Sequence, residues 1–419
     1  MTTDARAGYW SSPWPGEDNG PTRRATTVGG PQFDEGVTVV HREAMATTMV
    51  VLREPGEVFA LRHTAGPGAI GWVERIDAVT LETQARSDDL EAGPVWPGGV
   101  AVHANGDLYT VFGNHAHRLS AATLEVIAKT RLPRVKPYNS FVILPDGHLV
   151  TKDFGGVLPG HDPATHAYEP TEMLVLEPDS LAIVARCSVP EASIARLSSV
   201  DDDVYLVGVE SLWRLQWDGT ALTIDESFTA RYCTIAGQTY GWDPVIALGA
   251  VWFLDNGFGS ERYAGTFRNQ GVNLVPLHLV RVDLETQAVS LTEICGLPGG
   301  VVANPPIIDE VRRIAVGYDS GNGVIAAFDV ALDGSLRLRW RRDQNHACHP
   351  LLFGDSGDLV TADHDPVRFA DDIVLLDVET GDERARVASG SPVQSVLFPA
   401  AGFDRDLYYC SFTAIARVS

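Results

Sequence analysis

The stretch Pro137-Tyr-Asn-Ser-Phe-Val-Ile-Leu-Pro-Asp-Gly-His-Leu-Val-Thr-Lys-Asp-Phe-Gly-Gly156 predicts a β-hairpin. The apolar run Phe141–Leu144 precedes a Pro-Asp-Gly turn, and the second run is His148–Thr151. Asp-Gly between two strand-like runs favours a tight turn, because glycine adopts positive φ there without steric cost. A hairpin brings its two ends together, so Asn139 and Asp153 are expected at one edge of the sheet.

The strand expected after this hairpin recurs along the chain. It has the form of a short apolar run, an Asp and a polar turn, and it is seen as Arg75-Ile76-Asp77, Met173–Glu177, Arg281-Val282-Asp283-Leu284-Glu285-Thr286 and Leu375-Leu376-Asp377-Val378-Glu379-Thr380-Gly381. A repeat of roughly 40–65 residues is typical of a β-propeller with four strands in each blade. The sequence therefore predicts a single all-β propeller domain.

Inner strands can be counted from the repeat. The candidates are Met49–Leu52, Val100–His103, Phe141–Leu144, Ile194–Leu197, Val245–Leu248, Pro306–Ile308, Leu351–Phe353 and Val396–Phe398. Eight blades are predicted, with seven as the alternative. The last unit has only three strands, and Val37–Arg42 is predicted to pair with it and close the ring, since an open sheet edge is a liability.

Residues 1–32 are rich in Pro, Gly, Ser and Thr, which predicts an extended N-terminal arm without a core of its own. Trp10 and Trp14 indicate that this arm packs on the propeller, which would span residues 33–419. Two long insertions, Phe154–Thr171 and Phe258–Asn273, lie between expected second and third strands. Such loops emerge on one face of a propeller, where they are expected to border a single cavity.

Composition limits the classes of partner. The chain has 419 residues, 45% hydrophobic residues and a formal net charge of −23, which argues against nucleic acid or an anionic membrane as a partner. Five cysteines without C-x-x-C spacing, and the absence of an apolar leader or an 18-residue apolar run, predict a soluble, cytoplasmic protein with reduced thiols. The oligomeric state is left open.

Polar residues are expected to converge where inner strands begin and second strands end. They include Asn139, Asp243, Asn304 and His349 at the first position, and Asn114, Asp153, Asp255, Asp319 and Asp363 at the second. Asn and Asp oxygens are the ligands that Ca²⁺ prefers. Asn139, Asp153, Asp243 and Asp255 are the predicted metal ligands.

Histidines and a lysine complete the candidate site. His346, His349 and His364 are placed at the mouth of the funnel, where an imidazole could act as general base and Asp363 could orient it. His349, Asp153, His346 and Asp363 are the candidate catalytic residues. The candidate substrate-binding residues are Lys152, Tyr138, Trp242, Asn304 and His364.

The hairpin Pro137–Phe141, Leu144–Gly147 and Asp153 resembles the calcium-dependent lactonases of the gluconolactonase and paraoxonase type, and also strictosidine-synthase-like propellers. The resemblance covers about 20 residues. It implies that Asn139, which opens an inner strand, is a metal ligand, and Asp243 could supply a second ligand. Those families usually have six blades, and no counterpart of their N-terminal glutamate ligand is found.

The predicted function is that of an enzyme acting on a small organic substrate in the central funnel, by metal-assisted hydrolysis of a lactone or ester. Two alternatives are a non-catalytic scaffold that binds a protein by its top face, and a propeller lyase or isomerase. A four-histidine iron centre would need one histidine from each of four inner strands, and only His103 and His349 qualify. Quinone-dependent dehydrogenases also use eight blades, but their blade-to-blade tryptophan docking motif is not recognisable.

Overall fold

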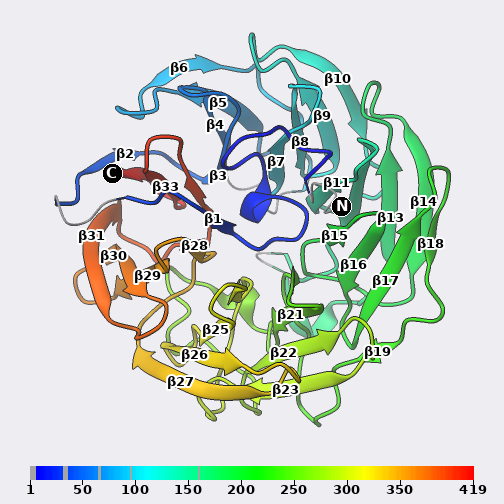
Figure 1. Ribbon diagram of the computed structural model, residues 1–419. Helices are drawn as coiled ribbons and strands as arrows, with labels where there is room; N and C mark the ends of the chain where they lie inside the picture. The colour runs from blue at the N-terminus through cyan, green and yellow to red at the C-terminus, as the bar shows by residue number, and fades with distance from the viewer. Residues whose placement is uncertain (1–5, 32–35, 65–67, 95–96, 159–160) are drawn as a thin grey trace.

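The structure is a computed structural model that describes residues 6–31, 36–64, 68–94, 97–158 and 161–419. These residues form eight sheets of at least four strands, arranged as blades in a ring (Figure 1). Inner strands of neighbouring blades contact one another from β3 to β11 and from β15 to β32, and β32 of the last blade contacts β3 of the first. The predicted eight-bladed all-β propeller is therefore confirmed.

Each blade runs from an inner strand outward. The first blade consists of β3 (Thr47–Leu52), β4 (Val58–His63), β5 (Gly71–Ile76) and β6 (Thr83–Arg86), and the second of β7 (Gly99–Val102), β8 (Leu108–Phe112), β9 (His115–Leu119) and β10 (Val126–Arg131). The third consists of β11 (Tyr138–Ile143), β12 (Leu149–Asp153), β13 (Thr171–Leu176) and β14 (Ile183–Val189). The fourth consists of β15 (Ser198–Val200), β16 (Asp203–Val207), β17 (Ser211–Trp217) and β18 (Leu222–Ile224), and β19 (Ala230–Arg231) also pairs with β17.

The other four blades follow the same order. The fifth blade consists of β20 (Val245–Ala247), β21 (Ala250–Leu254), β22 (His278–Asp283) and β23 (Val289–Glu293), and the sixth of β24 (Ile307–Asp309), β25 (Ile314–Asp319), β26 (Val324–Val330) and β27 (Leu336–Asp343). The seventh consists of β28 (Leu351–Phe353), β29 (Asp358–Asp365), β30 (Ala370–Asp377) and β31 (Glu383–Ser391). The eighth consists of β32 (Pro399–Ala401), β33 (Leu407–Cys410), β34 (Ala414–Val418) and β2 (Val39–Glu43). Among the described residues, the short 3-10 helices η1 (Glu17–Asn19), η3 (Pro163–Thr165) and η4 (Ser260–Arg262) lie in the arm and in the two insertions. No helix among the described residues is long and apolar enough to cross a membrane.

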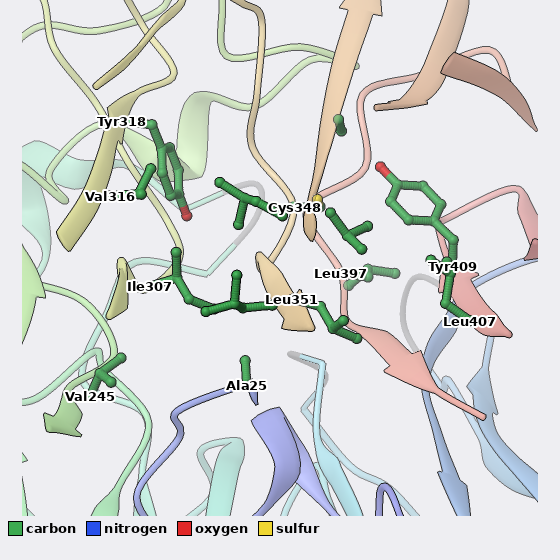
Figure 2. Packing of buried hydrophobic residues seen from close by; sticks show 14 of the residues in the cluster. Ala25, Val245, Ile307, Val316, Tyr318, Cys348, Leu351, Leu397, Leu407 and Tyr409 are labelled. Atoms are coloured by element: carbon green, nitrogen blue, oxygen red, sulfur yellow. The ribbon is translucent and has the colours of Figure 1, made fainter. Parts of the chain in front are cut away.

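Burial follows position in the blade. Every residue of β3 and of β11 is buried, whereas β10 alternates between exposed and half-buried residues. Inner strands lie between neighbouring blades, so both of their faces need apolar side chains, while the outer strand has one solvated face. Figure 2 shows Val245, Ile307, Leu351 and Leu397, from or beside successive inner strands, packed in one core.

The hairpin quoted above forms as predicted. β11 and β12 pair antiparallel with Phe141 opposite Thr151, and Gly147 takes a φ of 92° in the turn. Two other predicted inner strands were misplaced: the fourth begins at Ser198 rather than Ile194, and the eighth at Pro399 rather than Val396. In both cases the residues before the strand bond to a neighbouring blade: the Arg196 backbone N–H donates to Asp243, and the Leu397 carbonyl accepts from the His349 N–H.

The strand β2 pairs with β34, with Val39 opposite Val418 and Glu43 opposite Ala414. It is the outermost strand of the C-terminal sheet. Thr38, directly before β2, continues the pairing by exchanging two backbone hydrogen bonds with Ser419. Residues 6–31 form no strand of this sheet and reach the centre of the ring, where η1 and β1 (Thr26–Thr27) lie (Figure 1). β1 runs parallel to β28.

We call the face at which inner strands begin the top face, and the opposite one the bottom face. The arm crosses the inner strands toward the bottom face. Its carbonyls accept from inner-strand N–H groups in five blades, in the pairs Trp14–Leu52, Pro15–Val102, Pro21–Ser199, Thr22–Ile246 and Ala25–Leu352. These hydrogen bonds satisfy backbone N–H groups that would need water as a partner if they lined an open channel. The arm therefore fills the axis of the propeller from below, and Trp14 is 1% exposed.

Candidate functional site

Helix η1 places two carboxylates of the arm at the axis. Glu17 and Asp18 are both buried. Asp18 has a φ of 46° and a ψ of 37°, the left-handed region, which costs energy for residues other than Gly although Asp and Asn tolerate it best. A strained buried residue of this kind is retained when its surroundings fix it, and such residues gather at functional sites. The interactions of the Asp18 side chain are therefore the starting point for the site.

Asp18, His349 and Asp243 form the centre of the axial cluster. His349 Nδ1 lies 3.0 Å from Asp18 Oδ1, and Nε2 lies 4.0 Å from Asp243 Oδ2. Because a carboxylate only accepts, the Asp18 bond places the proton on Nδ1 and leaves Nε2 facing Asp243. One ligand atom from each of the three residues lies within 4.8 Å of the others, and all three residues are at most 2% exposed.

Two arginines bind the same carboxylates. Arg23 of the arm donates to Asp18 over 2.9 Å and also to Glu17 and to Ser140. Arg196 lies 3.1 Å from Glu17 and 3.8 Å from Asp243, and its guanidinium packs on the ring of Phe398. Burial alone would raise the pKa of the Asp18 carboxyl, but His349 and Arg23 outweigh burial and the pKa is lowered. Asp18 is therefore ionised.

Carboxylates outnumber guanidinium groups by one in the axial cluster. Glu17, Asp18 and Asp243 are three carboxylates, and Arg23 and Arg196 are two guanidinium groups; every one of these side chains is at most 6% exposed. A buried net charge is costly. The excess negative charge is offset by the neighbouring ammonium group of Lys152, whose charge interacts with Asp243, or by a bound cation.

Lys152 lies beside this cluster. Its Nζ donates to the carbonyls of Ser193, over 2.8 Å, and Asp153, over 3.2 Å. Burial lowers the pKa of the Lys152 amine to about 7, against the opposing charges of Asp153 and Asp243. An amine with this pKa exchanges protons at neutral pH, which an ordinary lysine does not do.

The four predicted metal ligands do not come together. Asp243 belongs to the axial cluster, and Asn139 is buried beside the fourth blade, with Nδ2 donating to Ile194 and Oδ1 without a hydrogen-bond partner among the described residues. Asp153 pairs with Arg134 over 2.9 Å and accepts from the Glu172 N–H. Asp255 bonds His278 through Nδ1, over 2.8 Å, and through the backbone N–H. The prediction failed because Asp153 and Asp255, at the ends of their second strands, turn to the third strand of their own blade.

Of the predicted catalytic residues, His349 lies in the axial cluster and the other three do not. His346 is buried against the Tyr318 ring, its Nδ1 accepts from the Ala362 N–H, and burial lowers its pKa to about 3. Asp363 pairs with Arg386 over 3.0 Å and accepts from the Asn345 N–H. Asp153 is held by Arg134 as described. Asp363 therefore does not orient His349; Asp18 does.

The predicted substrate-binding residues are mostly held by the scaffold. The Tyr138 hydroxyl donates to Glu172 over 2.5 Å, and Asn304 donates to the carbonyls of Ala347 and Val396. His364 is 5% exposed, with Nε2 3.3 Å from the Pro392 carbonyl. Trp242 is 4% exposed, and its indole N–H has no hydrogen-bond partner among the described residues. Lys152, the fifth, lies beside the axial cluster.

Sequence reasoning missed Glu17, Asp18, Arg23 and Arg196. The signal that was available is the run Gly16-Glu-Asp-Asn-Gly20 within an otherwise uncharged stretch, followed by Arg23 and Arg24. The bonds that give these residues their place join positions as far apart as 18 and 349. Nothing in local periodicity indicates such a contact, so the arm's contribution could not be assigned.

Comparison with known proteins identifies the fold and no family. No protein-family model and no curated protein matches the chain. Among solved structures, the quinohemoprotein alcohol dehydrogenase ADHIIG of Pseudomonas putida HK5 aligns with a TM-score of 0.65 and 8% identity over 100% of this chain and 83% of that one. BamB of Moraxella catarrhalis gives 0.59 and 13% over 91% and 97%, and a europium-containing methanol dehydrogenase gives 0.59 and 11% over 96% and 89%.

At these identities the likeness concerns the propeller fold alone. The matched proteins include dehydrogenases and BamB, so the shared architecture does not select one function. The resemblance of the hairpin to gluconolactonase- and paraoxonase-type lactonases remains an expectation from the sequence.

Proposed function

We propose that this chain is an enzyme that hydrolyses a small lactone or ester at the axial cluster, with the help of a divalent cation. The observation that carries the proposal is the orientation of His349. Asp18 holds its Nδ1, and Nε2 faces Asp243 Oδ2 across 4.0 Å. That separation is too long for a hydrogen bond and suits two groups that share a water molecule or a cation between them.

The donor set decides which cation fits. Asp243 and His349 would hold the ion, with Asp18 as a third ligand or as the group that orients the imidazole. Ca²⁺ takes six to eight oxygen ligands, which this set of two carboxylates and one imidazole does not approach. Imidazole with carboxylate suits Zn²⁺, Mn²⁺ or Fe²⁺. When bound, such an ion would polarise the substrate carbonyl as a Lewis acid.

The chain's own residues have separate tasks in this proposal. Asp18 fixes the tautomer and ring orientation of His349, which also packs on Phe398 with ring centroids 3.7 Å apart. Arg196, 3.8 Å from Asp243, places a positive charge beside the cluster, where it would stabilise an oxyanion that forms next to Asp243. Lys152, with a pKa of about 7, can accept the proton that water loses.

The test is hydrolysis of a panel of uncharged lactones and aryl esters, with metal analysis of the same purified sample. We expect His349→Gln and Asp243→Asn to lower kcat/KM by about 10²-fold or more, the lower end of what a positioned general base or metal centre contributes. His161→Gln is the matched control, because His161 is an exposed histidine of the first insertion. Activity that is insensitive to chelator, with no bound metal, would contradict the metal-assisted mechanism, and unchanged activity in both variants would contradict the site.

One observation favours a second function, a scaffold that binds a protein by its top face. Large apolar side chains are exposed on loops between second and third strands, which emerge on that face: Leu274 is 84% exposed, Val367 85% and Phe369 70%. Val367 and Phe369 lie two residues apart on one loop, and a contiguous exposed apolar patch is typical of an interaction surface. Replacing Val367 and Phe369 by Ser would weaken such a complex without changing hydrolysis, which separates the two functions.

A further inference from the structure

A groove lies on the top face beside the fourth and fifth blades. It has a volume of about 690 Å³ and is lined by Tyr168, Val209, Ile235, Tyr240 and Phe258, among others. Tyr168 comes from the insertion 154–171 and Phe258 from the insertion 258–273, so both long insertions border one cavity, as the sequence predicted. The volume is within the range of about 300–1,000 Å³ that is usual for small-molecule sites.

The walls of the groove are fixed before any ligand arrives. Asn273 Nδ2 donates to the carbonyls of Asn256, Phe258 and Gly300, and its Oδ1 accepts from the Thr239 hydroxyl. Gly257 donates its N–H to the Tyr240 carbonyl, and a Cβ at this position would lie 2.8 Å from the Tyr240 ring and 2.6 Å from the Trp242 indole nitrogen. The insertion is therefore seated directly on the tyrosine wall, and a site whose walls are already ordered loses less entropy when it binds.

The chemistry of the groove selects an uncharged, ring-bearing ligand. Tyr168 and Tyr240 stand edge to face, with ring centroids 6.2 Å apart, and aromatic walls favour a further ring by offset or edge contact. The charged lining residues, Glu210 and Arg231, pair with each other over 2.8 Å. Burial raises the pKa of the Cys233 thiol to about 12, so it stays neutral. The lining offers no unpaired charge that would recruit an ion.

We propose that this groove is the subsite for the aromatic or alicyclic substituent of an uncharged ester or lactone. This proposal rests on the proposed hydrolase function, since the reacting carbonyl would lie at the axial cluster. Tyr240 in the groove and Asp243 in the cluster are three residues apart, so their Cα atoms are separated by at most about 11 Å.

The experiment measures binding apart from turnover. The probe is prodan, an uncharged naphthalene fluorophore whose emission shifts to the blue in apolar surroundings, titrated against native protein, Phe258→Ala, Tyr168→Ala and the control Phe369→Ala. Phe369 is a 70% exposed aromatic residue on a different top-face loop. We expect each groove variant to weaken the Kd for prodan about tenfold, the control to leave it unchanged, and Asp243→Asn to leave it unchanged as well.

A second readout links the groove to catalysis. Phe258→Ala should raise KM for esters of phenylacetic acid about tenfold relative to acetate esters, with little change in kcat. If no variant hydrolyses any ester but the groove variants still lose prodan, the ligand site stands and the hydrolase function fails. If prodan binds equally to native protein and to both groove variants, or does not bind native protein, the groove proposal is overturned whatever the activity.

Discussion

Asp18→Asn is the substitution that best tests how the axial cluster is built. The change keeps the size of the side chain and removes its charge. The native carboxylate lies 2.9 Å from Arg23 Nη1 and 3.0 Å from His349 Nδ1, and both partners are at most 2% exposed. Arg23 keeps its ion pair with Glu17, so the loss is that of the charge-assisted hydrogen bonds to a buried carboxylate, at a cost of about 1.5–3 kcal/mol.

The measurement is the free energy of unfolding in urea at pH 7, compared with the control Asp89→Asn. Asp89 pairs with Arg86 over 2.6 Å but is 56% exposed, and such surface pairs contribute at most about 1 kcal/mol. The pKa of Asp18 is lowered, so its stabilisation is present above the unfolded-state pKa and is lost as the pH falls through the folded-state pKa. The difference between native protein and Asp18→Asn should therefore shrink below pH 4.

Equal losses of stability in Asp18→Asn and Asp89→Asn would refute this reasoning. So would a difference that stays constant as the pH falls to 3, because it would then arise from packing and not from the ionised carboxylate.

Three further predictions address other parts of the molecule. Burial raises the pKa of Asp371 to about 8, so the stability that comes from its neutral carboxyl is fully present below pH 4 and is lost as the pH rises to 8. The Tm of Asp371→Asn relative to native protein should therefore increase from pH 5 to pH 9. A difference in Tm that does not change with pH would argue against a protonated carboxyl. The pKa of Lys152 is lowered to about 7, so the buried ammonium group destabilises the native protein most below pH 7. The Tm of Lys152→Met relative to native protein should therefore be higher at pH 6 than at pH 9. Deleting residues 1–44 removes both the arm and β2, and we expect aggregation or a large loss of Tm; a monomeric deletion variant of native Tm would contradict the role of these segments.

The fold could be predicted because its information is local. Asp146-Gly147 specifies a turn, flanking apolar runs specify strands, and the repetition of this unit specifies blades. The seventh inner strand, Leu351–Phe353, was placed at its observed residues by the apolar run alone. The fourth was misplaced by four residues, because Ile194 and Leu197 are apolar for packing between blades while their backbone is still in the connecting segment.

The site could be predicted only in part, because its contacts are long-range. Asp243 and His349 were placed at the axis from their position before inner strands, and both lie there. Their partner Asp18 is in the arm, and no pattern in residues 1–32 indicates that η1 enters the ring. Asp153 and Asp255 were expected to face the axis, but each accepts a backbone N–H from the third strand of its own blade.

We propose that Asp18, Asp243 and His349 together form a cation-assisted hydrolytic centre. The most direct measurement is isothermal titration of Zn²⁺ and Mn²⁺ into chelator-treated protein, native and His349→Gln, followed by an assay of the same samples with an uncharged lactone. We expect one ion to bind per native chain, binding at least about tenfold weaker in the variant, and hydrolysis that returns only with the ion. Native protein that binds neither ion, or that hydrolyses the lactone equally well without one, would contradict it.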